Sequence, residues 1–276
     1  MNTSMITSSV TMGQLQQQLD TISNNLANAD RTGYKRREHS FSDLLAQQVN
    51  NQSAQQYEGG RLTPLGIRVG SGAKIAQTAL RMEQGSIQQT ERSLDFALTD
   101  RETFFPVQGE EGEVLYTRDG AFYLSPDPAN PDQQVIVRGD GNELLSGEGT
   151  PFVVPAGTRD FQLTNEGMME AVLANGESVN IGELELARIT KPQLLEGAGG
   201  SMFTLPDLAA LDIEAENVIE LVAGNEAQVQ QHALEQSNVD FSKEFADMLN
   251  AQRAYSFNAR SVSQGDQMMG LINNLR

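Results

Sequence analysis

The 276-residue sequence contains no cysteine and no tryptophan. Without cysteine, the chain can have neither a disulfide framework nor a thiolate that acts as nucleophile or metal ligand. No run of about 18 apolar residues occurs, so the sequence predicts no membrane-spanning helix. The first residues also lack a basic segment followed by an apolar one, so we expect no ordinary secretory signal. Taken alone, these absences indicate a cytosolic protein.

Histidine is scarce as well, with only His39 and His232 in the chain. The two lie far apart in sequence, without a Glu or Cys at ligand spacing, so we expect surface or packing roles and no metal site. No motif for a cofactor is present, and we expect none to be bound. The acidic residues Glu111 and Asp119 leave one enzymatic alternative open, a cell-wall hydrolase that uses a carboxylate pair.

Charge is distributed unevenly along the chain. Residues 1–100 are balanced, whereas residues 101–226 carry six basic and 23 acidic residues, a net charge of −17. Such an acidic middle is expected to stay solvated, and it argues against nucleic acid as a partner. The basic run at 35–37 is typical of a solvated loop, and a docking patch for an acidic neighbour is the alternative.

The last stretch, residues 238–276, has an apolar residue at every seventh position. The stripe consists of Phe241, Met248, Tyr255, Val262 and Met269, with Phe245, Ala259 and Ile272 at intermediate offsets. This spacing predicts an amphipathic helix roughly 50 Å long, with a repeat close to that of coiled coils. Gly265 interrupts the helix, either as an exposed weak point or as a place where a neighbouring helix approaches closely.

A second stripe at the other end of the chain predicts another helix, over residues 5–29. It contains Met5, Met12, Leu15, Leu19, Ile22 and Leu26. Gly33 is expected to adopt a left-handed conformation in the turn that follows. The two helices should pack on each other and leave apolar surface for further subunits. The alternative is a helix pair that only closes a monomeric fold.

Short apolar runs at about ten-residue spacing predict an antiparallel β barrel or sandwich between the helices. Asp119-Gly120 and Asn175-Gly176 are expected to form hairpin turns. Residues 41–49 could form a short helix. The predicted fold is therefore α+β, with paired coiled-coil-like terminal helices and an inserted, mainly antiparallel β domain. We divide it into an N-terminal helix (1–32), a connecting segment (33–90), a β domain (91–226) and a C-terminal helix (227–276).

Three groups of residues resemble the signatures of one family, the flagellar rod, hook and hook-associated proteins. They are Ser-Asn-Asn-Leu-Ala-Asn at 23–28 with Gly-Tyr-Lys at 33–35; Leu-Asp-Phe-Ala at 94–97, Phe-Phe-Pro-Val at 104–107 and Tyr-Thr-Arg-Asp-Gly at 116–120; and Ser-Asn-Val-Asp at 237–240 with Ala-Gln-Arg-Ala-Tyr at 251–255 and Asn-Ala at 258–259. Within the family, the length and the stretch 47–72 most resemble the distal-rod members. The sequence departs from the pattern at Arg31, where a small polar residue is usual, and at 99–102, where a Gly-rich turn is usual.

The resemblance implies a structural subunit of the bacterial flagellar basal body that polymerises into a helical tube and transmits torque. It implies export by the flagellar type III apparatus, contacts with copies of itself and with other rod and hook proteins, and no catalysis. A proximal-rod or hook subunit is the nearest alternative. The residues expected to make the assembly contacts on the N-terminal side are Met12, Leu15, Leu19, Ile22, Asn25, Leu26, Asn28, Gly33 and Tyr34. Those on the C-terminal side are Ser237, Asn238, Val239, Phe241, Phe245, Met248, Gln252, Arg253, Tyr255, Asn258, Val262 and Met269.

Overall fold

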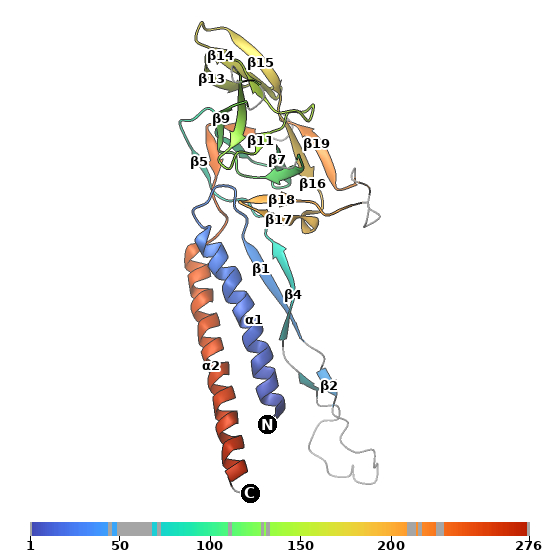
Figure 1. Ribbon diagram of the computed structural model, residues 1–276, viewed down its shortest axis with the longest axis vertical. Helices are drawn as coiled ribbons and strands as arrows, with labels where there is room; N and C mark the ends of the chain where they lie inside the picture. The colour runs from blue at the N-terminus through green and yellow to red at the C-terminus, as the bar shows by residue number, and fades with distance from the viewer. Residues whose placement is uncertain are drawn as a thin grey trace. The chain divides into compact units, whose positions relative to one another are not determined.

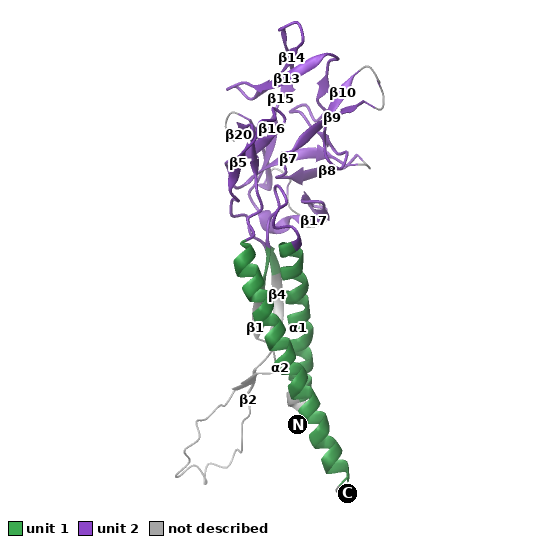
Figure 2. Cartoon of the chain, turned by 90° about the vertical axis from the view of Figure 1, so that its left-hand side faces the viewer, with its two compact units in different colours: residues 1–26, 37–79, 240–276 green, residues 27–36, 80–239 purple. Residues whose placement is uncertain are grey.

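The computed structural model describes residues 2–43, 46–48, 68–70, 73–109, 112–127, 130, 133–208, 214, 217–224 and 229–274. Two compact units are distinguished by colour in Figure 2. Unit 1 comprises residues 1–26, 37–79 and 240–276, and unit 2 comprises residues 27–36 and 80–239. Helices at both ends of the chain and antiparallel strands between them confirm the predicted α+β class.

Unit 1 contains the two long helices, α1 (Asn2–Ala27) and α2 (Phe241–Asn274), which lie side by side (Figure 1). The bounds of both agree with the stripes predicted at 5–29 and 238–276 to within a few residues. Residues 229–231 and 233–235, predicted as part of the C-terminal helix, form strands instead. The start of α2 is fixed by Asp240, whose Oδ1 accepts hydrogen bonds from the amides of Ser242 at 2.9 Å and Lys243 at 3.1 Å. Such a cap satisfies amide groups that have no partner within the helix.

The remaining strands of unit 1 form two small sheets. One pairs β1 (Arg37–Asp43) with β4 (Ala73–Leu80), and the other pairs β2 (Ala46–Gln48) antiparallel to β3 (Arg68–Gly70). The short helix predicted over 41–49 is therefore wrong, because most of that stretch lies in β1 and β2. A nine-residue helix is marginal by itself, and pairing with a distant strand satisfies the same backbone groups. Much of the stretch 47–72 lies outside the described residues.

Unit 2 is built from antiparallel strands, and its largest sheet has ten strands among the described residues. The path through this sheet is β12-β10-β11-β7-β8-β18-β17, with β9 beside β10, β16 beside β7, and β19 beside β16. The strands of this sheet are β7 (Thr103–Gln108), β8 (Val114–Thr117), β9 (Phe122–Pro126), β10 (Gln134–Arg138), β11 (Glu143–Leu144), β12 (Val153–Val154), β16 (Glu185–Ile189), β17 (Glu196–Gly199), β18 (Met202–Thr204) and β19 (Ile219–Ala223).

Smaller sheets complete unit 2. A three-stranded sheet has the order β13-β14-β15, and two strand pairs join β20 to β6 and β21 to β5. Their bounds are β5 (Ile87–Gln89), β6 (Phe96–Leu98), β13 (Thr158–Leu163), β14 (Met168–Leu173), β15 (Ser178–Glu183), β20 (Val229–Gln231) and β21 (Ala233–Glu235), and a short 3-10 helix η2 spans Pro192–Leu194. Since β20 and β21 pair with β6 and β5, the two ends of the unit's sequence meet.

The two predicted hairpins have different outcomes. Asn175-Gly176 does join β14 to β15, and Gly176 has the positive φ of 85° that such a turn requires. Asp119-Gly120 does not form a hairpin, because β8 pairs with β7 and β18 whereas β9 pairs with β10. The chain instead runs past Phe96, whose amide donates to the Gly120 carbonyl at 3.0 Å. A Cβ at Gly120 would lie 1.8 Å from the Phe96 oxygen, so glycine is required there for close backbone approach.

The core of unit 2 lies between the large sheet and the three-stranded sheet. Phe105 and Phe122 are fully buried and meet edge to face, with ring centroids 5.3 Å apart. Met169 and Ala171 of β14 belong to the same cluster. A second cluster includes Phe104 and Phe203, with centroids 6.0 Å apart. Unit 2 therefore has an interior of its own.

Candidate functional site

The apolar residues predicted on α1 are buried or half-buried in the structure. Ile22 is buried, and four further residues are half-buried: Met12, Leu15, Leu19 and Leu26. None of these five side chains is free on the surface of the unit. The α1 stripe therefore packs first within unit 1 itself.

Asn25 links three elements of unit 1. Its side chain is only 1% exposed. The amide nitrogen donates to the Arg37 carbonyl at 2.9 Å and to Glu244 Oε2 at 3.3 Å, and its oxygen accepts from the Arg37 amide at 3.0 Å. Glu244 lies in the first turn of α2 and is also buried. A buried polar group with this many partners fixes the relative position of the elements that supply them.

The predicted stripe on α2 divides into a covered centre and exposed ends. Met248, Tyr255 and Val262 are half-buried, whereas Phe241 is 58% and Met269 is 41% exposed. A seven-residue repeat drifts about 20° per heptad around a straight helix, so the four heptads of this stripe turn through roughly 80°. One helix partner cannot cover the whole stripe, and its ends are left on the surface.

The start of α2 presents aromatic surface. Phe245 is 46% exposed and stacks on Phe241, with ring centroids 6.3 Å apart and an interplanar angle of 4°. Further along, Gln252 and Arg253 are exposed, as expected for the polar face. Asn258 is half-buried and donates to the Ala254 carbonyl of its own helix at 2.9 Å.

Sequence reasoning missed several exposed apolar residues on the helices. Phe257 is 72% exposed, the most exposed of the large hydrophobic side chains in the described chain. The others are Ile6, Leu249, Met268 and Leu271. Phe257 comes six residues after the buried Ala251, which places it about 120° away from the covered face. An aromatic residue outside the heptad stripe is the signal that could have identified it.

Gly265 lies where the helices approach closely. A Cβ at this position would come within 2.9 Å of Met5 Cγ and 3.0 Å of its sulfur. Of the two interpretations of this glycine, close approach of a neighbouring helix is confirmed. Because this neighbour is a flexible methionine side chain, a small substitution would displace Met5 rather than break the helix.

In unit 2, the turn after α1 is held against the β structure. Gly33 has a φ of 65°, as predicted, and its amide donates to the Glu235 carbonyl at 2.9 Å. A Cβ at Gly33 would lie 2.3 Å from the Asp119 amide nitrogen. Tyr34 is buried, and Asn28 is half-buried with its carbonyl accepting from the Arg31 amide at 3.2 Å. This turn is therefore packed within unit 2. We call the region formed by residues 28–36 and their neighbours, among them Asp119 and Glu235, the base of unit 2.

The predicted residues before α2 hold the same region together. Asn238 Oδ1 accepts from the Arg36 amide at 2.8 Å, and its Nδ2 donates to the carbonyls of Arg81 at 2.7 Å and Glu83 at 2.9 Å. The buried Ser237 accepts from the Val239 amide at 3.2 Å through its hydroxyl. These motif residues bind the backbone of unit 2.

A cluster of buried charges lies at the centre of this base, and we call Lys35, Arg118 and Glu235 the base triad. The three side chains are at most 2% exposed. Glu235 Oε1 accepts from Lys35 Nζ at 2.7 Å and from the Gly85 amide at 2.9 Å. Its Oε2 accepts from Nε and Nη2 of Arg118, each at 2.8 Å. One carboxylate thus serves two cations.

Each cation of the base triad has further acceptors. Arg118 Nη1 donates to the carbonyls of Asp100, Arg101 and Thr103 at 2.8–3.0 Å. Lys35 Nζ also donates to the Glu83 carbonyl at 2.8 Å. Burial, followed by the nearby Arg118 charge, lowers the pKa of Lys35 to about 8, against the opposing effect of the Glu235 carboxylate. Both interpretations of the basic run at 35–37 are therefore wrong for Lys35, which is neither in a solvated loop nor on a surface.

The structure also tests the residues considered for chemistry. Asp119 accepts a hydrogen bond from the Thr32 hydroxyl at 2.7 Å and from the Ala121 amide at 3.2 Å, so its carboxylate holds two backbone segments. Glu111 lies outside the described residues. His39 is hydrogen-bonded to the hydroxyls of Thr21 and Thr78, which is a packing role between α1 and β4.

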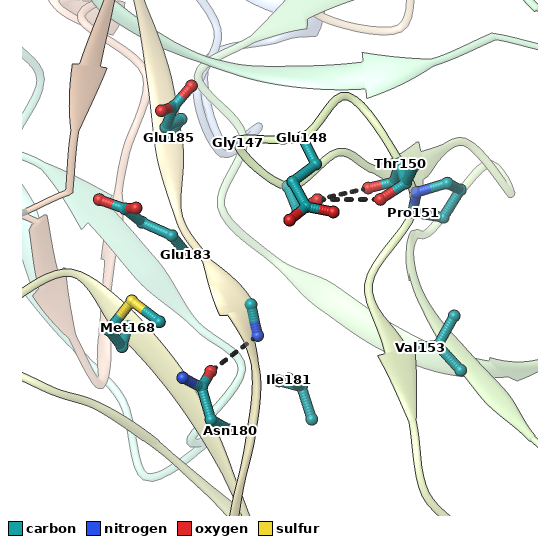
Figure 3. A pocket seen from close by; sticks show the side chains of 12 residues that line it. Gly147, Glu148, Thr150, Pro151, Val153, Met168, Asn180, Ile181, Glu183 and Glu185 are labelled. Carbon is teal, nitrogen blue, oxygen red and sulfur yellow. Dashed lines mark hydrogen bonds between the residues drawn. The ribbon is translucent and has the colours of Figure 1, made fainter.

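Unit 2 contains a pocket of about 650 Å³, shown in Figure 3. Its lining includes Glu148, Glu183 and Glu185 but no histidine, lysine or arginine. The Ser146 hydroxyl beside it is bonded to Thr150, at 2.9 Å to the carbonyl and 3.2 Å to the hydroxyl. Among the described residues, no group of three or more His, Asp or Glu could hold a metal ion. No helix in the described part of the chain is long and apolar enough to cross a membrane.

Comparison with known protein families yields three matches. Residues 5–35 match "Flagella basal body rod protein", residues 100–171 match "Flagellar hook protein FlgE/F/G D1 domain", and residues 230–275 match "Flagellar basal body rod FlgEFG protein C-terminal". The first and last of these ranges contain nearly all of α1, all of α2, and the motifs at 23–35 and 237–259. The middle range contains β7 to β12, which are six of the ten described strands of the large sheet.

Relatives align over nearly the whole chain. The flagellar hook-basal body complex protein FlhP of Bacillus subtilis is 37% identical over 277 aligned residues, covering 99% of each chain. The flagellar basal-body rod protein FlgG of Caulobacter vibrioides is 30% identical and covers 96% of each chain. FlgG of Borreliella burgdorferi is also 30% identical, covering 95% of this chain and 94% of its own. With these full-length similarities, the chain belongs to the family of flagellar basal-body rod and hook proteins.

Proposed function

We propose that this structural protein of the flagellar basal-body rod polymerises through its two terminal helices into a helical tube, as a subunit of the distal rod, and has no catalytic activity. The observation that supports this most directly is the apolar surface left on α2. Phe241, Phe257 and Leu271 are all more than half exposed, although the predicted stripe of α1 is buried or half-buried. Exposed apolar surface of this kind is typical of protein contact sites.

The arrangement of this surface favours a polymer over a closed dimer. Exposed apolar residues occur at the start, middle and end of α2, from Phe241 to Ile272. Contacts between different surfaces of identical subunits generate helical assemblies when the rotation does not close. Rigid packing of many such helices is the means by which a tube would transmit torque.

The polarity of α1 supports the same proposal. Residues 5–19 contain no charged side chain, and their polar positions are Ser, Thr, Gln and one Gly. A helix surface of this composition can be covered by other helices without removing charges from water. The strongly acidic stretch 101–226 belongs entirely to unit 2 and is expected to remain solvated.

The proposed distal position rests on the resemblance of the sequence to distal-rod members, and the proposed partners rest on the names of relatives. Two of the three relatives described above carry the name FlgG, basal-body rod protein, and one carries the name hook-basal body complex protein. We propose that the chain is exported by the flagellar type III apparatus and that its axial neighbours are other rod and hook proteins.

Electron microscopy of basal bodies isolated from cells with a labelled copy of the chain tests the proposal. Label along the outer part of the rod supports a distal-rod subunit. Label next to the inner membrane or along the hook would replace it with the proximal-rod or hook alternative. Incubation of the purified protein with peptidoglycan tests the enzymatic alternative, and turnover that is lost in Asp119→Asn would contradict a purely structural role.

A further inference from the structure

The base triad contains one more positive charge than its neighbours require. Arg118 alone neutralises Glu235 through two hydrogen bonds to Oε2. Lys35 then adds a second buried cation, held by Glu235 Oε1 and the Glu83 carbonyl. Burying an ammonium group without a carboxylate of its own is unfavourable, and such groups are often kept for a reason other than stability.

Residues 32–36 and β21 meet at the triad. They differ in the buried charge that would remain if either one detached. If residues 32–36 detach, Lys35 returns to water and the pair of Arg118 and Glu235 remains neutral and hydrogen-bonded. If β21 detaches, Glu235 leaves and two cations remain buried without a counter-charge. The first opening is therefore far less unfavourable in its charge balance than the second.

The other contacts of the two segments follow the same order. Residues 32–36 contain the buried Tyr34 and make backbone hydrogen bonds from the Gly33 amide to the Glu235 carbonyl and from the Arg81 amide to the Arg36 carbonyl. Polar contacts join Thr32 to Asp119 and the Arg36 amide to Asn238. The C-terminal segment contributes two paired strands, β20 on β6 and β21 on β5. The fully buried Ala233 also lies in β21. More backbone pairing must break to free residues 229–235 than to free residues 32–36.

We propose that the base triad is a one-sided latch, in which residues 32–36 detach reversibly from unit 2 while residues 229–235 stay bound through the Arg118–Glu235 pair. The segment that detaches is the one that continues from α1 in sequence. Residues 32–36 can therefore leave their contacts in unit 2 while the rest of unit 2 stays folded. It is a property of the single chain and does not depend on assembly.

Hydrogen exchange followed by mass spectrometry on the full-length monomer at neutral pH tests the latch. Peptides that cover 32–36 should exchange at least about tenfold faster than peptides that cover 229–235, since they open separately. Equal protection of the two segments would overturn the proposal, because it would mean that the base opens as one unit.

Substitutions at the triad give a second test. In Lys35→Met, residues 32–36 should keep or gain protection because no ammonium is left to be rehydrated, and residues 229–235 should be unchanged. Glu235→Gln should accelerate exchange in both segments. The control is Lys191→Met, which removes an exposed lysine of unit 2 and should change neither segment. Faster exchange of 229–235 in Lys35→Met would contradict the latch even if Glu235→Gln does not fold.

Discussion

Phe257 offers the sharpest test of the assembly surface, because it is nearly free in the monomer. Its ring is 72% exposed on α2. A phenylalanine has about 200 Å² of surface, so about 140 Å² would be covered if a neighbouring subunit packs over it. At about 25 cal/mol per Å², that burial stabilises the contact by about 3.5 kcal/mol. Phe257→Ala should therefore weaken association of each subunit by two to three orders of magnitude, at about 1.4 kcal/mol per tenfold.

The monomer should tolerate the same change. Little of the ring is covered, and alanine has the higher helix propensity, so helix content and melting should be unaltered. The assays are motility in soft agar, the yield of rods in isolated basal bodies, and the amount of exported subunit. Gln252→Ala, at an exposed polar position of the same helix, should behave as the unchanged protein in all three. Motile cells with a normal rod yield in Phe257→Ala would refute the assignment of this face to subunit contacts.

Three further results are expected. Tyr255→Ala, at the half-buried centre of the α2 stripe, should leave unit 2 with a normal melting transition but abolish motility; retained motility would show that the stripe does not hold the assembly. Gly33→Ala should lower the melting temperature of unit 2 more than Gly141→Ala. Both glycines have positive φ, but a Cβ at Gly33 would lie 2.3 Å from the Asp119 amide nitrogen, whereas a Cβ at Gly141 would have nothing within 4 Å. Equal decreases in melting temperature would contradict the clash at Gly33. The folded-state pKa of Lys35 is about 8 against an ordinary 10.5, so between these pH values the unfolded state binds more protons than the folded state. The free energy of unfolding, relative to that of Lys35→Met, should therefore rise by on the order of 2–3 kcal/mol as the pH increases from 8 to 10.5. Urea denaturation at both pH values measures this difference, and a difference that does not change with pH would count against a buried ammonium.

The helices were predictable from the sequence because their signal is local and repeated. Apolar residues at seven-residue spacing determine both the element and the face that it covers. Gly33 and the turn at Asn175-Gly176 were predictable for a similar reason, since a positive φ restricts the residue type. The resemblance to flagellar proteins was carried by short motifs, and the structure gives several of their residues, such as Asn25 and Asn238, a hydrogen-bonding role.

The failures involve strand pairing, charge pairing and exposure, which the local sequence does not determine. Asp119-Gly120 has the composition of a hairpin turn, but the strands on either side pair elsewhere. Lys35 has the neighbours of a solvated basic run, but its partner Glu235 is 200 residues away. Phe257 was missed because a periodic pattern describes the covered face and ignores an aromatic residue outside it. Local patterns therefore give the elements, whereas charge pairing and exposure depend on the tertiary fold.

The separation in sequence between Lys35 and Glu235 also determines when, during synthesis, the base of unit 2 can form. A chain grows from its N-terminus, so Lys35 and Arg118 are synthesised long before the carboxylate that neutralises them. Until Glu235 emerges, burying both Lys35 and Arg118 is too unfavourable. Before then β20 and β21 also cannot pair with β6 and β5. The base of unit 2 can therefore close only near the end of synthesis, and for most of its time on the ribosome the chain stays open.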